Sequence, residues 1–223
     1  MELLAYLIES FLFALAGISV YTLANASNEF VTISSEHAPE KMISLLCFNR
    51  SDAESMLDRV REDGELGADA KVVCVELDKL YKFACEAAAE LGPLTAFRFL
   101  PDRREVYNAI KLHQAAGHEA DRLVGVPVFQ VESLVITGAD GKKSLPLFFS
   151  KMDADVAARE AFKENFDDAT IEVGVLEDVL TRMESPGWRQ WDSVSFVPPG
   201  KCEEMFSGAP VDTDETNDSR RRR

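Results

Sequence analysis

The sequence predicts an α/β protein of two duplicated lobes with mixed sheets, related by a pseudo-two-fold axis. Three observations predict it. The order of helix-like and strand-like segments in the first half recurs in the second half. Helical segments alternate with β-branched apolar runs, which is typical of α/β folds. Asp140 and Gly141 lie between two such runs and form a hairpin signal, so antiparallel pairs should occur beside crossover connections.

Each lobe begins with a helix that stops at a glycine, followed by an apolar strand. Residues 16–21 (AGISVY) match residues 124–129 (VGVPVF), and the second of these strands follows a helix-like stretch over 109–123. The later pairs are second strands at 29–33 and 133–137, third strands at 43–48 and 144–149, helices beginning at Ser51 and Lys151, and fourth strands at 71–75 and 170–175. A repeat of about 100 residues is too long for a solenoid unit, so two lobes are expected.

The boundary between the lobes is predicted at Leu91, Gly92 and Pro93. The first lobe then covers residues 1–92, and the second covers 93–206, including a strand at 95–100 and a closing strand at 193–197. Residues 207–223 are rich in Gly, Asp, Thr, Asn and Arg, and we interpret them as a disordered tail.

The N-terminal segment is strongly apolar, and three interpretations compete. A signal peptide begins with basic residues, but Glu2 stands there, although residues 24–26 (ANA) resemble a cleavage site. A membrane span needs about 20 uncharged residues, and Glu9 interrupts this run. Apolar residues recur here at helical spacing, so we expect a helix over residues 3–16 that packs on the soluble domain and ends at Gly17.

The charge and the cysteines exclude several classes of protein. Lys plus Arg total 24 and Asp plus Glu total 39, giving a net charge of −15, which argues against general nucleic-acid binding and against docking of the whole surface on anionic lipid. The four cysteines, Cys47, Cys74, Cys85 and Cys202, form no CxxC pair and do not cluster with the three histidines. A zinc site or a dithiol redox centre is therefore not expected.

No catalytic, cofactor-binding or metal-binding constellation emerges from the remaining polar residues. The carboxylate pairs Asp52/Glu54 and Asp153/Asp155 lie at predicted helix starts, where acidic side chains are electrostatically favoured. His113 and His118 are five residues apart, off the spacing that aligns two ligands on a helix, and we interpret them as surface residues. We therefore expect no enzyme activity.

An ordered set of segments resembles a known family, the twenty-two-kilodalton component of the translocon at the inner chloroplast envelope (TIC), which includes cyanobacterial relatives. The resemblance covers roughly residues 1–201. The segments are GISVYTL at 17–23, SNEFV at 27–31, LLCF at 45–48, DAE at 52–54, FRFLPD at 97–102, GVPVFQ at 125–130, LFFSKMD at 147–153 and VSFVPPG at 194–200.

The resemblance implies a non-catalytic, chaperone-like factor in protein import across the chloroplast envelope. Its implied partners are precursor proteins with their transit peptides and the envelope translocon components, and its implied location is the intermembrane space, soluble or peripheral to the membrane. Plastid members made outside the organelle carry a transit peptide. Here Met1 begins almost at the folded domain, without an Arg- and Ser-rich leader.

Strand aromatic residues near the junction of the lobes are the candidate client groove. They are Phe48, Phe97, Phe99, Phe129, Phe148 and Phe149. An apolar groove with an acidic rim would suit basic, amphipathic transit peptides. Two alternatives remain open, a redox-inactive thioredoxin-like binding module and a structural subunit of a plastid complex. Residues 125–129, the hairpin and the next strand and helix resemble the second half of a thioredoxin, in which such a proline is cis.

Overall fold

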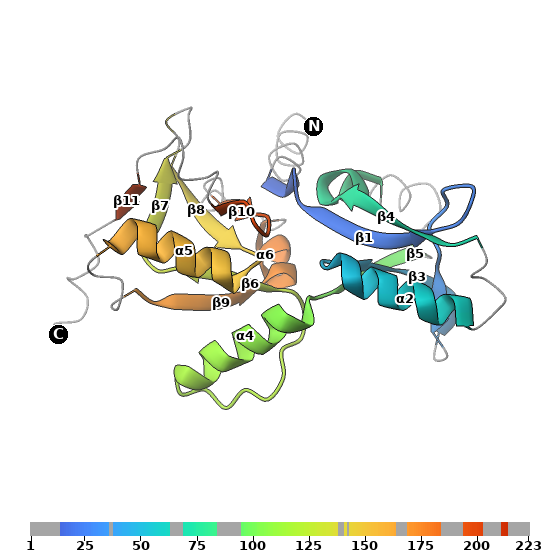
Figure 1. Cartoon of the computed structure of the whole chain (residues 1–223), viewed down its shortest axis with the longest axis horizontal. Coiled ribbons are helices and arrows are strands. Elements are labelled where there is room, and N and C mark those ends of the chain that lie inside the picture. The colour runs from blue at the N-terminus through green and yellow to red at the C-terminus, as the bar shows by residue number, and fades with distance from the viewer. Residues whose placement is uncertain are drawn as a thin grey trace. The chain divides into compact units, whose positions relative to one another are not determined.

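The structure, a computed structural model, describes residues 14–35, 38–62, 69–83, 95–137, 141, 143–163, 169–183, 194–202 and 211–213. It divides the chain into two compact units, 1–102 and 103–223 (Figure 1). Each unit has a mixed sheet with helices, so the α/β class predicted from the sequence is confirmed.

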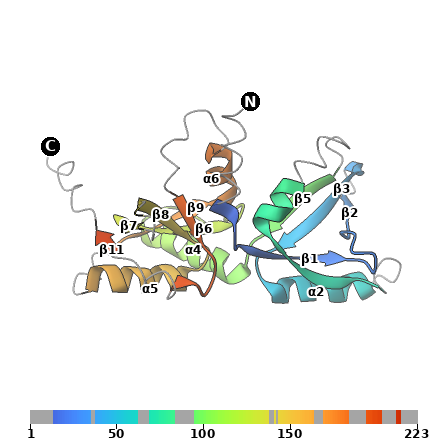
Figure 2. The same ribbon diagram turned by 90° about the horizontal axis from the view of Figure 1, so that it is seen from above.

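The first unit is a five-stranded sheet with α2 (Arg50–Glu62) on one face. Its strands are β1 (Ser19–Ala24), β2 (Ile33–Ser35), β3 (Ala38–Cys47), β4 (Lys71–Glu76) and β5 (Thr95–Leu100). The order is β2-β3-β1-β4, and β5 pairs in parallel with the C-terminal half of β3. Leu57 of α2 packs against Leu23 and Val72 of the sheet, while the helical segment 77–83 lies on the opposite face (Figures 1 and 2).

The second unit is a six-stranded sheet in the order β11-β7-β8-β6-β9, with β10 parallel to β8. Its elements are α4 (Arg103–Ala115), β6 (Pro127–Val131), β7 (Leu134–Thr137), β8 (Lys143–Phe148), α5 (Lys151–Phe162), β9 (Ile171–Val175), α6 (Leu176–Met183), β10 (Val194–Val197) and β11 (Val211–Thr213). Helices α4 and α5 lie side by side on one face (Figure 2). Ser150 caps α5, because its side chain accepts a hydrogen bond from the Asp153 amide.

The two sheets share one pairing scheme. In each, the first strand pairs antiparallel with the third and fourth, and the fifth joins the third in parallel. Single hydrogen bonds recur as well: the amide of Leu77 donates to the Ile18 carbonyl and that of Leu176 to the Val126 carbonyl, both at 2.8 Å. This agreement supports the predicted duplication, and the pseudo-two-fold axis stays a prediction.

The chain divides later than the sequence suggested. Because β5 pairs with β3, residues 95–100 belong to the first sheet, and the division falls after Asp102 instead of at residue 92. Within the expected tail 207–223, β11 pairs antiparallel with β7. These differences arise because the partner of a strand is set by tertiary pairing, which local sequence does not encode.

Two predicted helices have different outcomes. The helix expected over 109–123 ends at Ala115, because Gly117 adopts a left-handed backbone with φ of 85° and terminates it. The helix expected over residues 3–16 lies outside the described residues except for its last residues, of which 14 and 15 are helical. None of the helices that the structure describes is both long and apolar enough to cross a membrane.

Candidate functional site

The three aromatic residues predicted in the second unit form its core. Phe129 of β6 and Phe148 of β8 are direct register partners, and both are fully buried. Ala154, Ala157 and Ala158 of α5 lie in the same core cluster. Phe149 is also buried and stacks on Phe196 with ring centroids 5.7 Å apart. These side chains pack the fold and offer no surface to a ligand in this structure.

The three aromatic residues predicted in the first unit are half-buried. Phe97 and Phe99 alternate along β5, so both point to one face of the sheet. The ring of Phe48 meets the edge of Phe99 at a centroid distance of 5.7 Å. Phe48 and Phe99 hold the positions in their unit that Phe149 and Phe196 hold in the other. The first unit therefore keeps a partly open aromatic pair where the second has a closed one.

Two further aromatic residues extend this face, and sequence reasoning missed them. Phe30 meets Phe97 edge-on at 6.0 Å and Phe83 edge-on at 5.9 Å. Phe83, at the end of the helical segment 77–83, is 51% exposed. We call Phe30, Phe48, Phe83, Phe97 and Phe99 the aromatic face. It contains three of the six predicted residues and joins them to two that come from a hairpin and a helix.

The hairpin after β1 positions Phe30. The amide of Glu29 donates to the Asn25 side-chain oxygen at 2.9 Å, and the Asn25 side-chain amide donates to the Glu29 carboxylate at 2.8 Å. Asn28 takes the left-handed backbone that Asn tolerates, with φ of 63°. An Asn-rich turn before an aromatic residue is the signal in the sequence that could have marked Phe30 as part of a fixed hairpin.

The aromatic face can bind apolar groups. Each edge-to-face pair is worth about 0.5–1.5 kcal/mol beyond its buried area, so the rings hold one another in place before any ligand arrives. The face is partly open to solvent, because Phe83 is exposed and the other four rings are half-buried. The chemistry that these rings offer a ligand is stacking and apolar burial.

The predicted helix-start carboxylates have structural partners. The buried carboxylate of Asp153 accepts a hydrogen bond from the Gly200 amide at 2.7 Å and so fixes the loop after β10. Asp155 pairs with Lys151 at 2.7 Å, and Glu54 pairs with Arg50 at 2.9 Å. Within the ranges that the structure describes, no group of three or more His, Cys, Asp or Glu side chains is placed to hold a metal ion.

The cysteines are separate, and none of the three that the structure describes is in a disulfide. Burial raises the pKa of the Cys47 thiol to about 11, and the nearby Asp52 carboxylate adds to this effect. Cys202 is buried and donates to the Asp153 carbonyl at 3.2 Å, whereas Cys74 is exposed on β4. Cys85 lies outside the described residues. Pro127 follows a trans peptide bond, unlike the cis proline of the thioredoxin comparison.

Comparisons with known proteins identify the family to which the chain belongs. The model of the Tic22-like family matches residues 4–207. Protein TIC 22, chloroplastic, from Arabidopsis thaliana is 40% identical over 190 residues, which are 84% of this chain and 67% of that protein. The protein of the same name from Pisum sativum is 39% identical over 193 residues, covering 84% of this chain and 72% of its own length.

A solved structure shows the same fold. Anabaena Tic22, described as a protein-transport protein, superposes with a TM-score of 0.72 over 88% of this chain and 95% of its own, at 20% sequence identity. The identity is too low to carry more than the fold. The family-model match and the two chloroplastic relatives confirm the resemblance found in the sequence: this chain belongs to the Tic22-like family.

Proposed function

We propose that this chain acts without catalysis in protein import across the chloroplast envelope, where its aromatic face binds unfolded or translocating precursor chains. The observation that carries the proposal is that face: five phenylalanine rings from four parts of the first unit, with Phe83 51% exposed. Membership of the Tic22-like family supports the transport role, because its relatives bear the name of the chloroplast TIC protein. The intermembrane space and the translocon components remain the proposed location and partners.

The chemistry of the surface suits transit peptides. These peptides are amphipathic and Arg-rich with few acidic residues. The net charge of −15 attracts them over long range, and the aromatic face then accepts their apolar side chains. Binding of this kind is weak and tolerant of sequence, because an unfolded chain must be ordered as it binds. The attraction should decrease as salt screens the charges.

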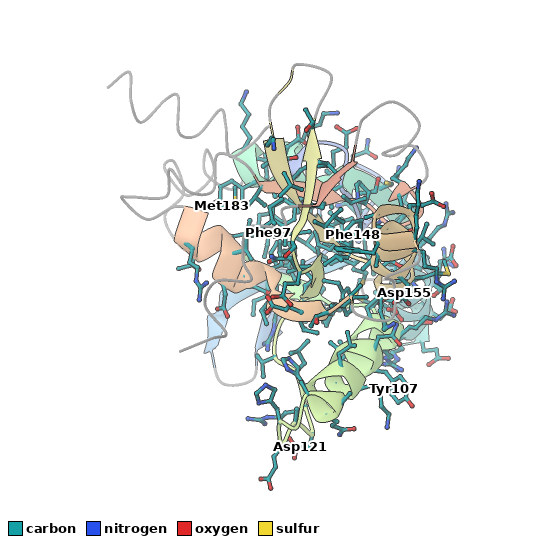
Figure 3. All side chains as sticks on the ribbon, turned by 90° about the vertical axis from the view of Figure 1, so that its left-hand side faces the viewer. Phe97, Tyr107, Asp121, Phe148, Asp155 and Met183 are labelled. Carbon is teal, nitrogen blue, oxygen red and sulfur yellow. The ribbon has the colours of Figure 1, made fainter. Side chains whose placement is uncertain are left out.

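Photocrosslinking tests the proposal. A photoreactive phenylalanine analogue replaces Phe83, and the matched control carries it at Tyr107, an aromatic residue of α4 that is 61% exposed and outside the aromatic face (Figure 3). During import into isolated plastids, position 83 should crosslink to precursor, and the crosslinks should fade as import finishes. Equal yields at both positions would refute a client site on this face.

A binding assay with purified protein complements the crosslinks. Phe83→Ser and Tyr107→Ser both alter exposed side chains, so both variants should fold. Phe83→Ser should weaken the binding of a labelled transit peptide about ten-fold, corresponding to the 1.4 kcal/mol expected for one lost aromatic contact, and Tyr107→Ser should not. In the crosslinking experiment, one partner protein that stays crosslinked when no import takes place would instead indicate that this chain is a structural subunit of a fixed complex.

A further inference from the structure

Two histidines lie close together in the structure, although their spacing of five residues would not align them on one continuous helix. The imidazole rings of His113 and His118 lie with centroids 6.0 Å apart and planes at 72°. His113 is in the last turn of α4 and is half-buried, and His118 follows the helix and is exposed. Neither imidazole makes a hydrogen bond to another described side chain. We infer that this histidine pair is a binding site for a divalent transition-metal ion of the zinc type.

The end of α4 explains how residues five apart meet. The Gly117 amide donates to the Gln114 carbonyl, and the His118 amide donates to the His113 carbonyl, both at 3.0 Å. These two bonds, with the left-handed Gly117, are the Schellman motif. That motif brings the residue two positions after the helix back over the last turn, where an apolar contact is usual. Here both contacting residues are histidines.

The loop that follows is also fixed. The Gln114 side-chain amide donates to the Ala120 carbonyl at 2.8 Å, and the Ala120 amide donates to the His118 carbonyl at 3.0 Å. A backbone bound in this way holds the two imidazoles near each other before an ion arrives, which lowers the cost of ordering the ligands. The spacing rule for two ligands on one helix does not apply to this pair, because the helix ends at Ala115.

The ring separation is close to that of a bound pair. With Zn–N distances of about 2.0–2.1 Å and tetrahedral geometry, two imidazoles on one ion have centroids roughly 5 Å apart. The observed 6.0 Å is roughly 1 Å longer than this separation. Neutral imidazole is a preferred ligand of Zn²⁺, Cu²⁺ and Ni²⁺. Water would fill the remaining coordination positions, because both imidazoles lie at the surface end of α4 and His118 is exposed.

Zn²⁺ binding to the purified full chain, measured by calorimetry, tests the site. The chain has three histidines, so His37→Asn is the matched control. The intact protein and His37→Asn should bind one ion with equal affinity. His113→Asn and His118→Asn should each bind about ten-fold more weakly or less, since even outer-shell changes cost 10–100-fold in metal affinity. Equal binding by all four proteins, or no binding by the intact protein, would overturn the inference.

Gly117 provides a test of positioning. Nothing lies within 4 Å of a Cβ built there, so a substitution at Gly117 is limited only by the left-handed backbone conformation and not by steric clashes. Asn tolerates the left-handed region and should keep the ion, whereas Val, a β-branched residue, should displace His118 and weaken binding. Cu²⁺ electron paramagnetic resonance gives a second readout, because the intact protein should show two nitrogen ligands and Gly117→Val one. Two nitrogens in Gly117→Val would contradict the proposed geometry.

Discussion

Gly125→Ala should destabilise the second unit far more than an alanine at other left-handed glycines. Gly125 has φ of 101° and leads the chain into β6, beside the start of α6. A Cβ built at this position would lie 2.5 Å from a methyl carbon of Val175 and 2.7 Å from a carboxylate oxygen of Glu177. That same oxygen accepts a hydrogen bond from the Val126 amide at 2.9 Å, so moving it away breaks a contact that the fold uses.

The magnitude follows from two separate costs. An L-residue in the left-handed region costs about 1–2 kcal/mol, and overpacking a filled site costs about 1–3 kcal/mol. The Val175 side chain is β-branched and cannot rotate freely to make room. The sum of about 2–5 kcal/mol is a large part of the roughly 5–15 kcal/mol that stabilises a typical protein. Gly117→Ala, with φ of 85° and nothing within 4 Å of the new Cβ, should show only the first cost.

Urea unfolding followed by tryptophan fluorescence measures both variants with one probe. The two tryptophans, Trp188 and Trp191, are both in the sequence of the second unit, so the signal reports that unit. Gly125→Ala should lower the free energy of unfolding by at least about 1 kcal/mol more than Gly117→Ala, the smallest overpacking cost. If the two variants lost equal stability, the close approach of Val175 and Glu177 would have no energetic weight.

Two further predictions concern buried groups of the first unit. Ser44 is fully buried and its hydroxyl finds no hydrogen-bond partner among the described residues, so Ser44→Ala should raise the free energy of unfolding by about 1 kcal/mol. Thr22→Val, which removes a hydroxyl that donates to the Leu45 carbonyl at 2.8 Å, should lower it. Urea unfolding followed by circular dichroism, which detects the secondary structure of both units, measures the two variants, and a loss of stability in both would refute the reasoning. Because the pKa of Cys47 rises from 9.0 to about 11 on folding, the native state keeps a proton that the unfolded chain loses, and stability should fall between those pH values. The decline should be shallower in Cys47→Ala, and an unchanged slope would contradict it.

The element types and their order were predictable because local chemistry sets them. Glycine-led apolar strands and acidic helix starts occur in both halves, and the second half also has an Asp–Gly hairpin signal. Each signal acts through the backbone of a few residues. Which of the two sheets contains β5 was not predictable from the sequence. Its partner β3 is distant in the sequence, and no turn or cap at residues 95–100 records the parallel register between them.

The burial of the aromatic residues was not predictable either, since all six lie in or beside strands. In the second unit, the alanine-rich α5 comes close to the face that carries Phe129 and Phe148. In the first unit, the register partners that match this pair are Tyr21 and Cys47. Phe97 and Phe99 fall on the opposite face from Leu23 and α2 by strand alternation. Identical residue types therefore serve the core in one unit and a partly open face in the other.

This contrast suggests a functional difference between two units that share one strand-pairing scheme. Both units keep the same strand pairing and the same aromatic pair at 5.7 Å between the third and fifth strands. The second unit buries both this pair and the rings of Phe129 and Phe148, which removes more apolar area from water. The first unit leaves Phe48 and Phe99 half-buried and adds Phe30 and the exposed Phe83 beside them, forgoing some of that stabilisation. A surface that must bind and release unfolded chains needs such unburied rings, so we expect client binding to follow the aromatic face of the first unit and global stability to follow the core of the second.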